Sequence, residues 1–381
     1  MPGSTALTDS VSPTAPREVT LGRPLRVFAW LSFIAEILII GTGGAVRLTG
    51  SGLGCSDWPL CTPESLTPIL EIQGIHGAIE FGNRTMTGVV GLLALAVVML
   101  TLHALSGHRL VIRAVWFALG GIVVAIGVYA AASALGIVAS AALMSAALLL
   151  AVIVGMADSL RQTAQRRHLA VLAWLVLVGV MAQAVVGGFA VISDLNPFIV
   201  GFHYAVSLLL VCVTALYIVR LDTAPGPRAS VVPGWFAGLT HATGFFLALT
   251  ILFGVLTTGS GPHSGDANIQ RHGFDATFLA HVHSWPGYIL AVLVLTLAVS
   301  AWILKLAPRN WTLVLIVAIL VQVGVGVLQA RTGLPAIAVG IHMILASLSA
   351  AAYTVLVTRL KRPAQGWADP STGSGAQQLG R

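Results

Sequence analysis

The feature that most constrains this chain is its succession of apolar runs, each about 20 residues long, separated by short polar segments. Of its 381 residues, 57% are hydrophobic and only 9% are charged. A soluble protein of this length needs more charge to cover its surface, whereas helices that cross a bilayer need such runs. The sequence therefore predicts an all-α polytopic membrane protein.

Eight apolar runs form the expected core, and a further apolar block interrupts them. The core spans are 27–46, 76–105, 169–191, 200–220, 235–256, 277–302, 311–330 and 336–358. The block 114–156 is too long for one helix, so we expect an inserted two-helix hairpin with a turn near 132–135. The total is about ten transmembrane helices.

Basic residues occupy alternate connections, for example Arg161, Arg166 and Arg167. By the positive-inside rule, these connections and both chain ends lie in the cytoplasm. The net charge of +7 therefore reflects topology and does not indicate nucleic-acid binding. We expect cytoplasmic disordered tails at 1–25 and 361–381, a first half split into 26–113 and 158–222 by the hairpin 114–157, and a second half at 223–360.

The two halves repeat one another. Gln183 and Gln322 are each followed by glycine at four and eighteen residues and by histidine at twenty, His203 and His342. The segment Thr-Gly-Ser-Gly occurs at 49–52 and again at 258–261. Both copies begin on the inner side, so the sequence predicts two pseudo-symmetric four-helix bundles related by an axis along the membrane normal.

Five of the eleven histidines share one depth, near the outer ends of the even-numbered core spans: His76, His203, His281, His283 and His342. An ionisable residue inside a bilayer indicates function, and imidazole is the commonest metal ligand. Histidines on facing helices can hold a haem iron from both sides. His281 and His283 are two residues apart, so only one of them faces the bundle; their spacing from the repeat favours His283.

The second core span carries His76, Glu80 and Asn83 at i, i+4 and i+7, on one helical face. Glu80 has two interpretations. It is a structural carboxylate paired with Arg84, or it lies beside a substrate as proton acceptor or as stabiliser of a positive intermediate.

Arg47, Arg84 and Arg331 lie at the outer boundary of the expected spans. They suit outward-pointing carboxylates such as haem propionates, or they extend to lipid headgroups. Cys55 and Cys61, in an outer loop, favour a disulfide over a metal or catalytic pair. No Cys-x-x-Cys-His motif occurs, so a haem would be bound non-covalently.

Several segments together resemble the haem A synthase family. They are VRLTGSGLGC–DWPLC, IEFGNR, QAVVGGFAVISDLNP–VGFHYAVSLLL, LTTGSGPHSGD, LAHVH and VGVLQARTGLP–VGIH. The resemblance implies an eight-helix core in a prokaryotic plasma membrane, with the haem sites near the outer face. It implies oxidation of the C8 methyl of haem O to a formyl by successive hydroxylations, with haem O supplied by haem O synthase. It names no electron acceptor and leaves self-association open.

The same resemblance assigns roles to particular residues. It implies that His283 and His342 hold a haem b in the second half, and that His203 holds the iron of haem O in the first half. Glu80 takes the position of the family's glutamate, and Cys55 and Cys61 that of its outer disulfide.

One position departs from the family pattern. Many members read Glu-x-x-His-Arg on the second span, where this chain has Asn83, and Asn is a poor ligand for haem iron. Either His76 replaces the missing ligand, about 10 Å away along the helix, or this helix supplies none. The hairpin 114–157 is a second departure.

Two other functions fit parts of this pattern. A b-type cytochrome with two bis-histidine haems would explain the histidines but not Glu80 on their face. A transporter built from repeats would place its site at the membrane midplane, between discontinuous helices, whereas these polar groups lie near the outer edge.

Overall fold

The computed structural model describes residues 21–137, 140–263, 265–266 and 275–364. Within these ranges there are ten α-helices, each long and apolar enough to cross a membrane. They are α1 (Arg23–Leu48), α2 (Leu70–Ser106), α3 (His108–Ala134), α4 (Ser140–Gln162), α5 (Arg167–Ile192), α6 (Pro197–Leu221), α7 (Gly234–Ser260), α8 (Ala276–Ile303), α9 (Arg309–Arg331) and α10 (Ala336–Thr358). Two short strands, β1 (Arg228–Ser230) and β2 (Lys361–Pro363), complete the described elements. The prediction of an all-α polytopic membrane protein is confirmed.

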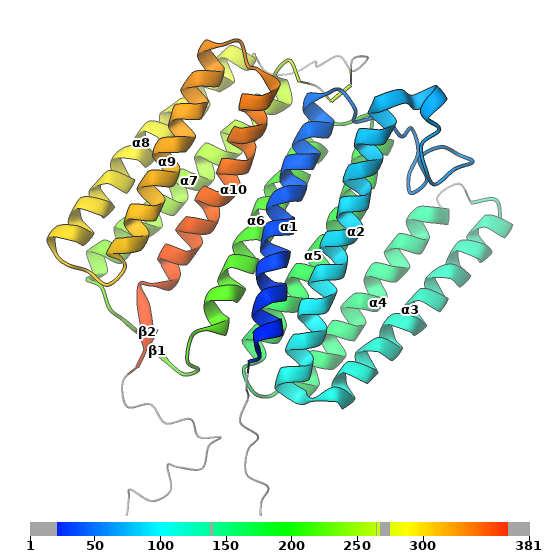
Figure 1. The fold of residues 1–381 in the computed structure, drawn as a ribbon, viewed down its shortest axis with the longest axis horizontal. Helices are drawn as coiled ribbons and strands as arrows, with labels where there is room; N and C mark the ends of the chain where they lie inside the picture. Colours follow the sequence, from blue (N-terminus) through cyan, green and yellow to red (C-terminus); the bar gives the residue numbers. More distant parts are fainter. Residues whose placement is uncertain (1–20, 138–139, 264, 267–274, 365–381) are drawn as a thin grey trace, which may run out of the picture.

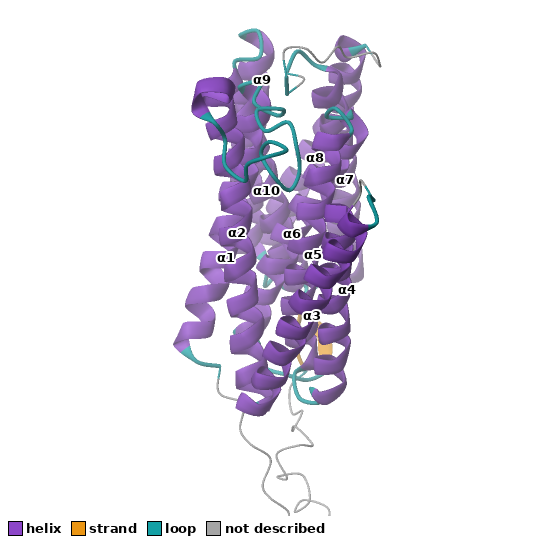
Figure 2. Cartoon of the chain, turned by 90° about the vertical axis from the view of Figure 1, so that its right-hand side faces the viewer, coloured by secondary structure: helices purple, strands orange, loops and turns teal. Residues whose placement is uncertain are grey.

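The helices run side by side along one common direction, with the loops at the two ends of the bundle (Figures 1 and 2). We call the end that carries residues 49–69 the outer end and the end that carries β1 and β2 the inner end. The helix α1 begins and β2 ends at the inner end (Figure 1). Both described ends of the chain therefore lie on one side, as an even number of spans requires.

Each half has its own apolar core. In the first half, Leu102 of α2 packs with Leu169 and Trp174 of α5. In the second half the fully buried side chains include Phe236, Val294, Leu297, Leu315 and Leu356. A smaller cluster joins the halves through α1, α6 and α10, and it includes Ile40, Val211 and Val355.

The inserted hairpin is α3 and α4, which stand at the edge of the first half, away from the second (Figure 1). Arg113 of α3 forms a two-point ion pair with Asp158 of α4, with both N···O distances at 2.7 Å. The hairpin packs on α2 and α5 and leaves the pairing of the two halves undisturbed.

Two segments differ from the sequence-based expectation. The helix α2 begins at Leu70 rather than near residue 76, and its backbone kinks at Gly74, where φ is +55°. Its 37 residues exceed the length of a single span, so the first turns project beyond the expected span. Part of the expected disordered tail from 361 is ordered, because Lys361–Pro363 pairs antiparallel with Arg228–Ser230.

Candidate functional site: two histidine sites in a repeated bundle

A cavity of about 380 Å³ lies inside the first half, bordered by α1, α2, α5 and α6. This volume falls in the usual range of ligand pockets. Five residues singled out from the sequence line it: Arg47, Glu80, Asn83, Arg84 and His203. The tertiary fold thus brings together residues that are up to 156 positions apart in the chain.

One face of α1 forms a wall of this cavity, with Glu36, Ile40, Gly43, Gly44 and Arg47 at helical spacing. Gly43 leaves room toward Asn83 of α2 and Gly44 toward Met343 of α10, because a glycine adds no side chain to the wall. The lining is mixed: charged and amide side chains such as Arg47, Glu80 and Asn83 stand among many apolar ones. An amphipathic ligand suits such a lining.

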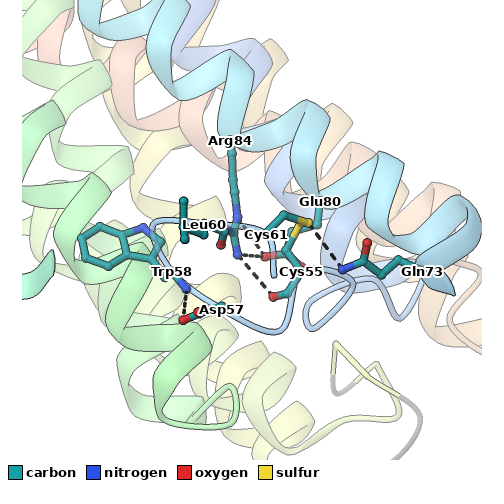
Figure 3. Close-up of polar contacts among 8 residues, drawn as sticks. All are labelled: Cys55, Asp57, Trp58, Leu60, Cys61, Gln73, Glu80 and Arg84. Carbon is teal, nitrogen blue, oxygen red and sulfur yellow. Dashed lines mark hydrogen bonds and ion pairs between the residues drawn. A yellow bond between two sulfur atoms is a disulfide. The ribbon is translucent and has the colours of Figure 1, made fainter. Parts of the chain in front are cut away.

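Glu80 ties α2 to the outer loop (Figure 3). One carboxylate oxygen accepts from the backbone N–H of Cys55 at 2.6 Å, and the other accepts from Arg84 Nη2, also at 2.6 Å. Arg84 also donates to the backbone carbonyls of Leu60 and Cys55. Both interpretations of Glu80 therefore stay open: it is ion-paired with Arg84, and it lines the cavity.

The outer loop that Glu80 holds is also closed covalently. Cys55 and Cys61 are both buried and form a disulfide, as the sequence predicted. The same loop sends the Trp58 ring against Gly188 of α5, over the cavity. From the second half, Gly265 accepts a hydrogen bond from Gly52 N–H at 2.7 Å, so both outer loops cover the first-half cavity.

The other two arginines lie in different settings. Arg47 lines the cavity and donates to the backbone carbonyls of His263 and Thr258 in the second half. Arg331 is exposed at the end of α9. The structure therefore brings Arg47 and Arg84 to the cavity, and Arg331 does not join them there. His263, in the outer loop after α7, bonds the Leu334 carbonyl through Nε2 at 2.9 Å.

Asn83 faces α1, where its Oδ1 accepts from Thr42 Oγ1 at 2.8 Å. A Cβ built on Gly43 would lie 3.7 Å from Asn83 Oδ1. His283 in the second half faces Gly254 of α7 in the same manner, at 3.0 Å from such a Cβ. Asn83 therefore occupies, in the first half, a position resembling that of a histidine in the second.

His76 is not brought to the cavity. It is exposed, and its Nδ1 lies 2.9 Å from Ser51 Oγ in the outer loop. The reason is its height: seven residues separate it from Asn83, or about 10 Å along α2, which places it at the level of that loop. The geometry favours the second alternative from the sequence, in which α2 supplies no imidazole.

His203 and His342 occupy matching positions in the two halves. A Cβ on Gly187 or Gly326 would lie 3.4 Å or 3.0 Å from the respective imidazole Cε1. Gln183 and Gln322 donate to the backbone carbonyls of His203 and His342, at 2.8 Å and 3.1 Å. The repeated Gln, Gly and His thus form the same local arrangement in both halves. The glutamine binds the backbone of the helix that carries the histidine, and the glycine leaves room for the imidazole ring.

The second half brings His283 of α8 and His342 of α10 next to one another, with their rings in an edge-to-face arrangement. Their ring centroids are 6.4 Å apart and their planes are inclined by 82°. Two imidazoles bound to opposite sides of one metal at about 2 Å have ring centres roughly 6 Å apart. His283 Nδ1 bonds the Thr250 carbonyl at 2.8 Å, which leaves Nε2 for a metal. His281 is exposed, so the structure favours His283 in this role.

The donor set fits a haem better than a bare ion. Within the described residues, no group of three or more His, Cys, Asp or Glu could hold a metal ion. Bare zinc takes three or four protein ligands, whereas a haem brings its own four nitrogens and needs only axial ligands. In the first half, His203 Nδ1 is buried and has no hydrogen-bond partner among the residues described. One axial imidazole is therefore available there.

Sequence reasoning missed two residues that line the cavity, Trp58 and Glu36, and it missed Thr42, which bonds Asn83. Trp58 lies in the quoted segment DWPLC, but its place over the cavity depends on how the outer loop folds, and Thr42 is a lone hydroxyl in an apolar run. Glu36 was noticeable as a carboxylate in the middle of a span, but its position on the cavity wall depends on how α1 is rotated.

Comparison with known proteins adds an independent finding. No family model matches the chain. The chain is 36% identical over 85 residues to "Heme A synthase" of Exiguobacterium sibiricum, which is 22% of this chain and 28% of that protein. It is 34% identical over 82 residues to "Heme A synthase" of Bacillus licheniformis, 21% and 26% of the two chains.

A third similarity is to "Protoheme IX farnesyltransferase" of Thermus thermophilus, 34% identical over 83 residues, 21% of this chain and 13% of that protein. The matched segments span about a quarter or less of these curated relatives. Together with the ten apolar helices described here and the matched histidine positions of the repeat, the matches support the haem A synthase family for this chain.

Proposed function

We propose that this protein takes part in haem A biosynthesis as a membrane haem A synthase, an oxidoreductase that converts the C8 methyl of haem O to a formyl. The observation that carries the proposal is the asymmetry of two otherwise matching halves. The second half opposes two imidazoles. The first half has one histidine, His203, on its cavity wall, together with Asn83 and Glu80. One half is built to hold a haem permanently and the other to act on one.

In the second half, His283 and His342 would hold the iron of a haem b. The Thr250 carbonyl fixes the ring of His283, and Gln322 fixes the backbone at His342. When bound, this haem would supply one-electron chemistry. Gly254 and Gly326, which have no side chains, leave room for the imidazole rings of His283 and His342.

In the first half, His203 would hold haem O, and Asn83 would leave the opposite side without a strong ligand. Glu80 is fixed by Cys55 N–H and Arg84, so its carboxylate has one orientation relative to the cavity. Such a carboxylate accepts a proton or stabilises a positive intermediate. Arg47, at the outer end of the cavity, suits the propionates.

The proposal includes a setting in the cell. The termini lie in the cytoplasm and the sites lie toward the opposite face, because basic residues gather at the inner end. The similarity to a protoheme IX farnesyltransferase supports a place in the haem O pathway, with haem O synthase as supplier. A membrane enzyme gives the farnesyl tail of haem O a place between helices and lipid.

The test is expression of the full chain with a haem O source, followed by pigment extraction and mass analysis. We expect haem A to form. Bound haem without any haem A would favour the b-type cytochrome instead. Purified protein without Soret absorption would favour a transporter.

A further inference from the structure

Glu36 is a buried carboxyl that the proposed chemistry does not use. It lies midway along α1 and is 3% exposed. Its Oε1 accepts from Thr214 Oγ1 of α6 at 2.8 Å and, at 3.4 Å, from Ser32 Oγ. Its Oε2 is buried and has no hydrogen-bond partner among the described residues. An unpaired polar atom in an apolar interior is costly, so it calls for an explanation.

The carboxyl also lines the cavity that holds His203 and Glu80. The cavity wall also includes apolar side chains of α1 and α6, among them Ile39, Ile40 and Leu210. Thr42, which bonds Asn83, lies six residues nearer the outer end, or about 9 Å along α1. Glu36 thus lies at the deep end of the cavity, about 9 Å below the level of Asn83.

Haem O carries a hydroxyl group that could pair with the free oxygen of Glu36. Its propionates lie on one edge of the porphyrin, and the hydroxyl of its hydroxyethylfarnesyl substituent lies on the other. Protohaem has a vinyl group in place of that substituent. If the propionates pointed toward Arg47, the hydroxyl edge would point toward the deep end of the cavity.

We propose that Glu36 is a specificity residue that binds the hydroxyl of the hydroxyethylfarnesyl group and so distinguishes haem O from protohaem. This inference rests on the proposed function. Thr214 and Ser32 occupy Oε1 and orient the carboxyl, and the ligand hydroxyl pairs with the remaining oxygen. A ligand without the hydroxyl leaves that oxygen unpaired, which is the strongest basis for rejecting a close analogue.

The test uses the full-length protein with its second half loaded with haem b. Protohaem, haematohaem and haem O are titrated into it, and binding is followed by the absorbance change. Haematohaem has hydroxyethyl groups in place of both vinyls and has no farnesyl tail, so it separates the hydroxyl from the tail. We expect the wild type to prefer haematohaem over protohaem by roughly 5- to 150-fold, the range for leaving one buried polar atom unpaired.

Glu36→Leu should reduce this ratio to about one. Thr101→Val is the matched control, because it removes a buried hydrogen bond of the first half, to Tyr217 at 2.6 Å, away from the cavity. It should keep the wild-type ratio. Equal binding of haematohaem and protohaem by the wild type would overturn the inference about Glu36 and leave the proposed function standing. An unchanged ratio in Glu36→Leu would do the same. No binding of any haem beyond that of the second half would overturn the proposed function and the inference with it.

Discussion

Replacing Glu80 by Gln separates the two interpretations of this carboxylate. The side chain keeps its shape but loses its charge and one acceptor oxygen. In the structure Glu80 accepts three hydrogen bonds, from Cys55 N–H at 2.6 Å and from Arg84 Nη2 and Nε at 2.6 and 3.2 Å. Hydrogen bonds to charged groups contribute about 1.5–3 kcal/mol each. Both bonds from Arg84 end on the same carboxylate oxygen, so the amide oxygen of glutamine can keep them and loses the one from Cys55 N–H. We expect Glu80→Gln to lower the free energy of unfolding by about 2–3 kcal/mol.

The expected functional result is loss of haem A with haem content unchanged, because the axial histidines are untouched. Extracted pigments are measured by mass, and stability by thermal unfolding of the purified protein. Asp158→Asn is the matched control: it breaks the ion pair with Arg113 on the hairpin, away from the cavity, and should still form haem A. Wild-type haem A from Glu80→Gln would refute the catalytic role. Loss of bound haem together with haem A would instead make Glu80 a binding or structural residue.

Three further predictions address the two haem sites and the loop. Asn83→His should place a second imidazole in the first half and convert its bound haem to a low-spin form that no longer binds carbon monoxide; persistent carbon monoxide binding would contradict the assigned position of Asn83. Gly326→Val should lower the Soret absorbance per chain by crowding His342, whereas Gly324→Val, with no atom within 4 Å of its Cβ, should not; equal effects would contradict the steric argument. Removing the disulfide by Cys55→Ser with Cys61→Ser should lower the free energy of unfolding by about 2 kcal/mol, the value for so short a loop; unfolding identical to the wild type, with and without reductant, would refute it.

Much of the architecture could be predicted from the apolar runs and the internal repeat of the sequence. A bilayer admits few spanning structures, so length and hydropathy alone predict where most of the helices lie; the start of α2, six residues earlier than expected, is the exception. The repeat showed that His203 and His342 are equivalent, and the structure explains the repeat by what Gln183 and Gln322 do: each bonds the backbone at its histidine. These features depend on spacing within one helix or between two helices that follow one another in the chain.

The arrangement of the site depends on distances between helices, which the spacing of residues along the sequence does not give. Helical periodicity says that His76, Glu80 and Asn83 share a face, but not how far each lies from the other helices. Packing placed Glu80 and Asn83 on the cavity and His76 at the loop, against Ser51. Packing between helices also placed Glu36 on the cavity wall.

The sequence by itself therefore determined the membrane class, the repeat, the disulfide and the set of candidate residues. Only the tertiary structure decided that His283, and not His281, opposes His342, and that Arg47 and Arg84 reach the cavity while Arg331 does not. The physical reason is that the rotation of a helix about its axis and its height against its neighbours are set by side-chain packing between helices. Both are properties of pairs of segments far apart in the chain.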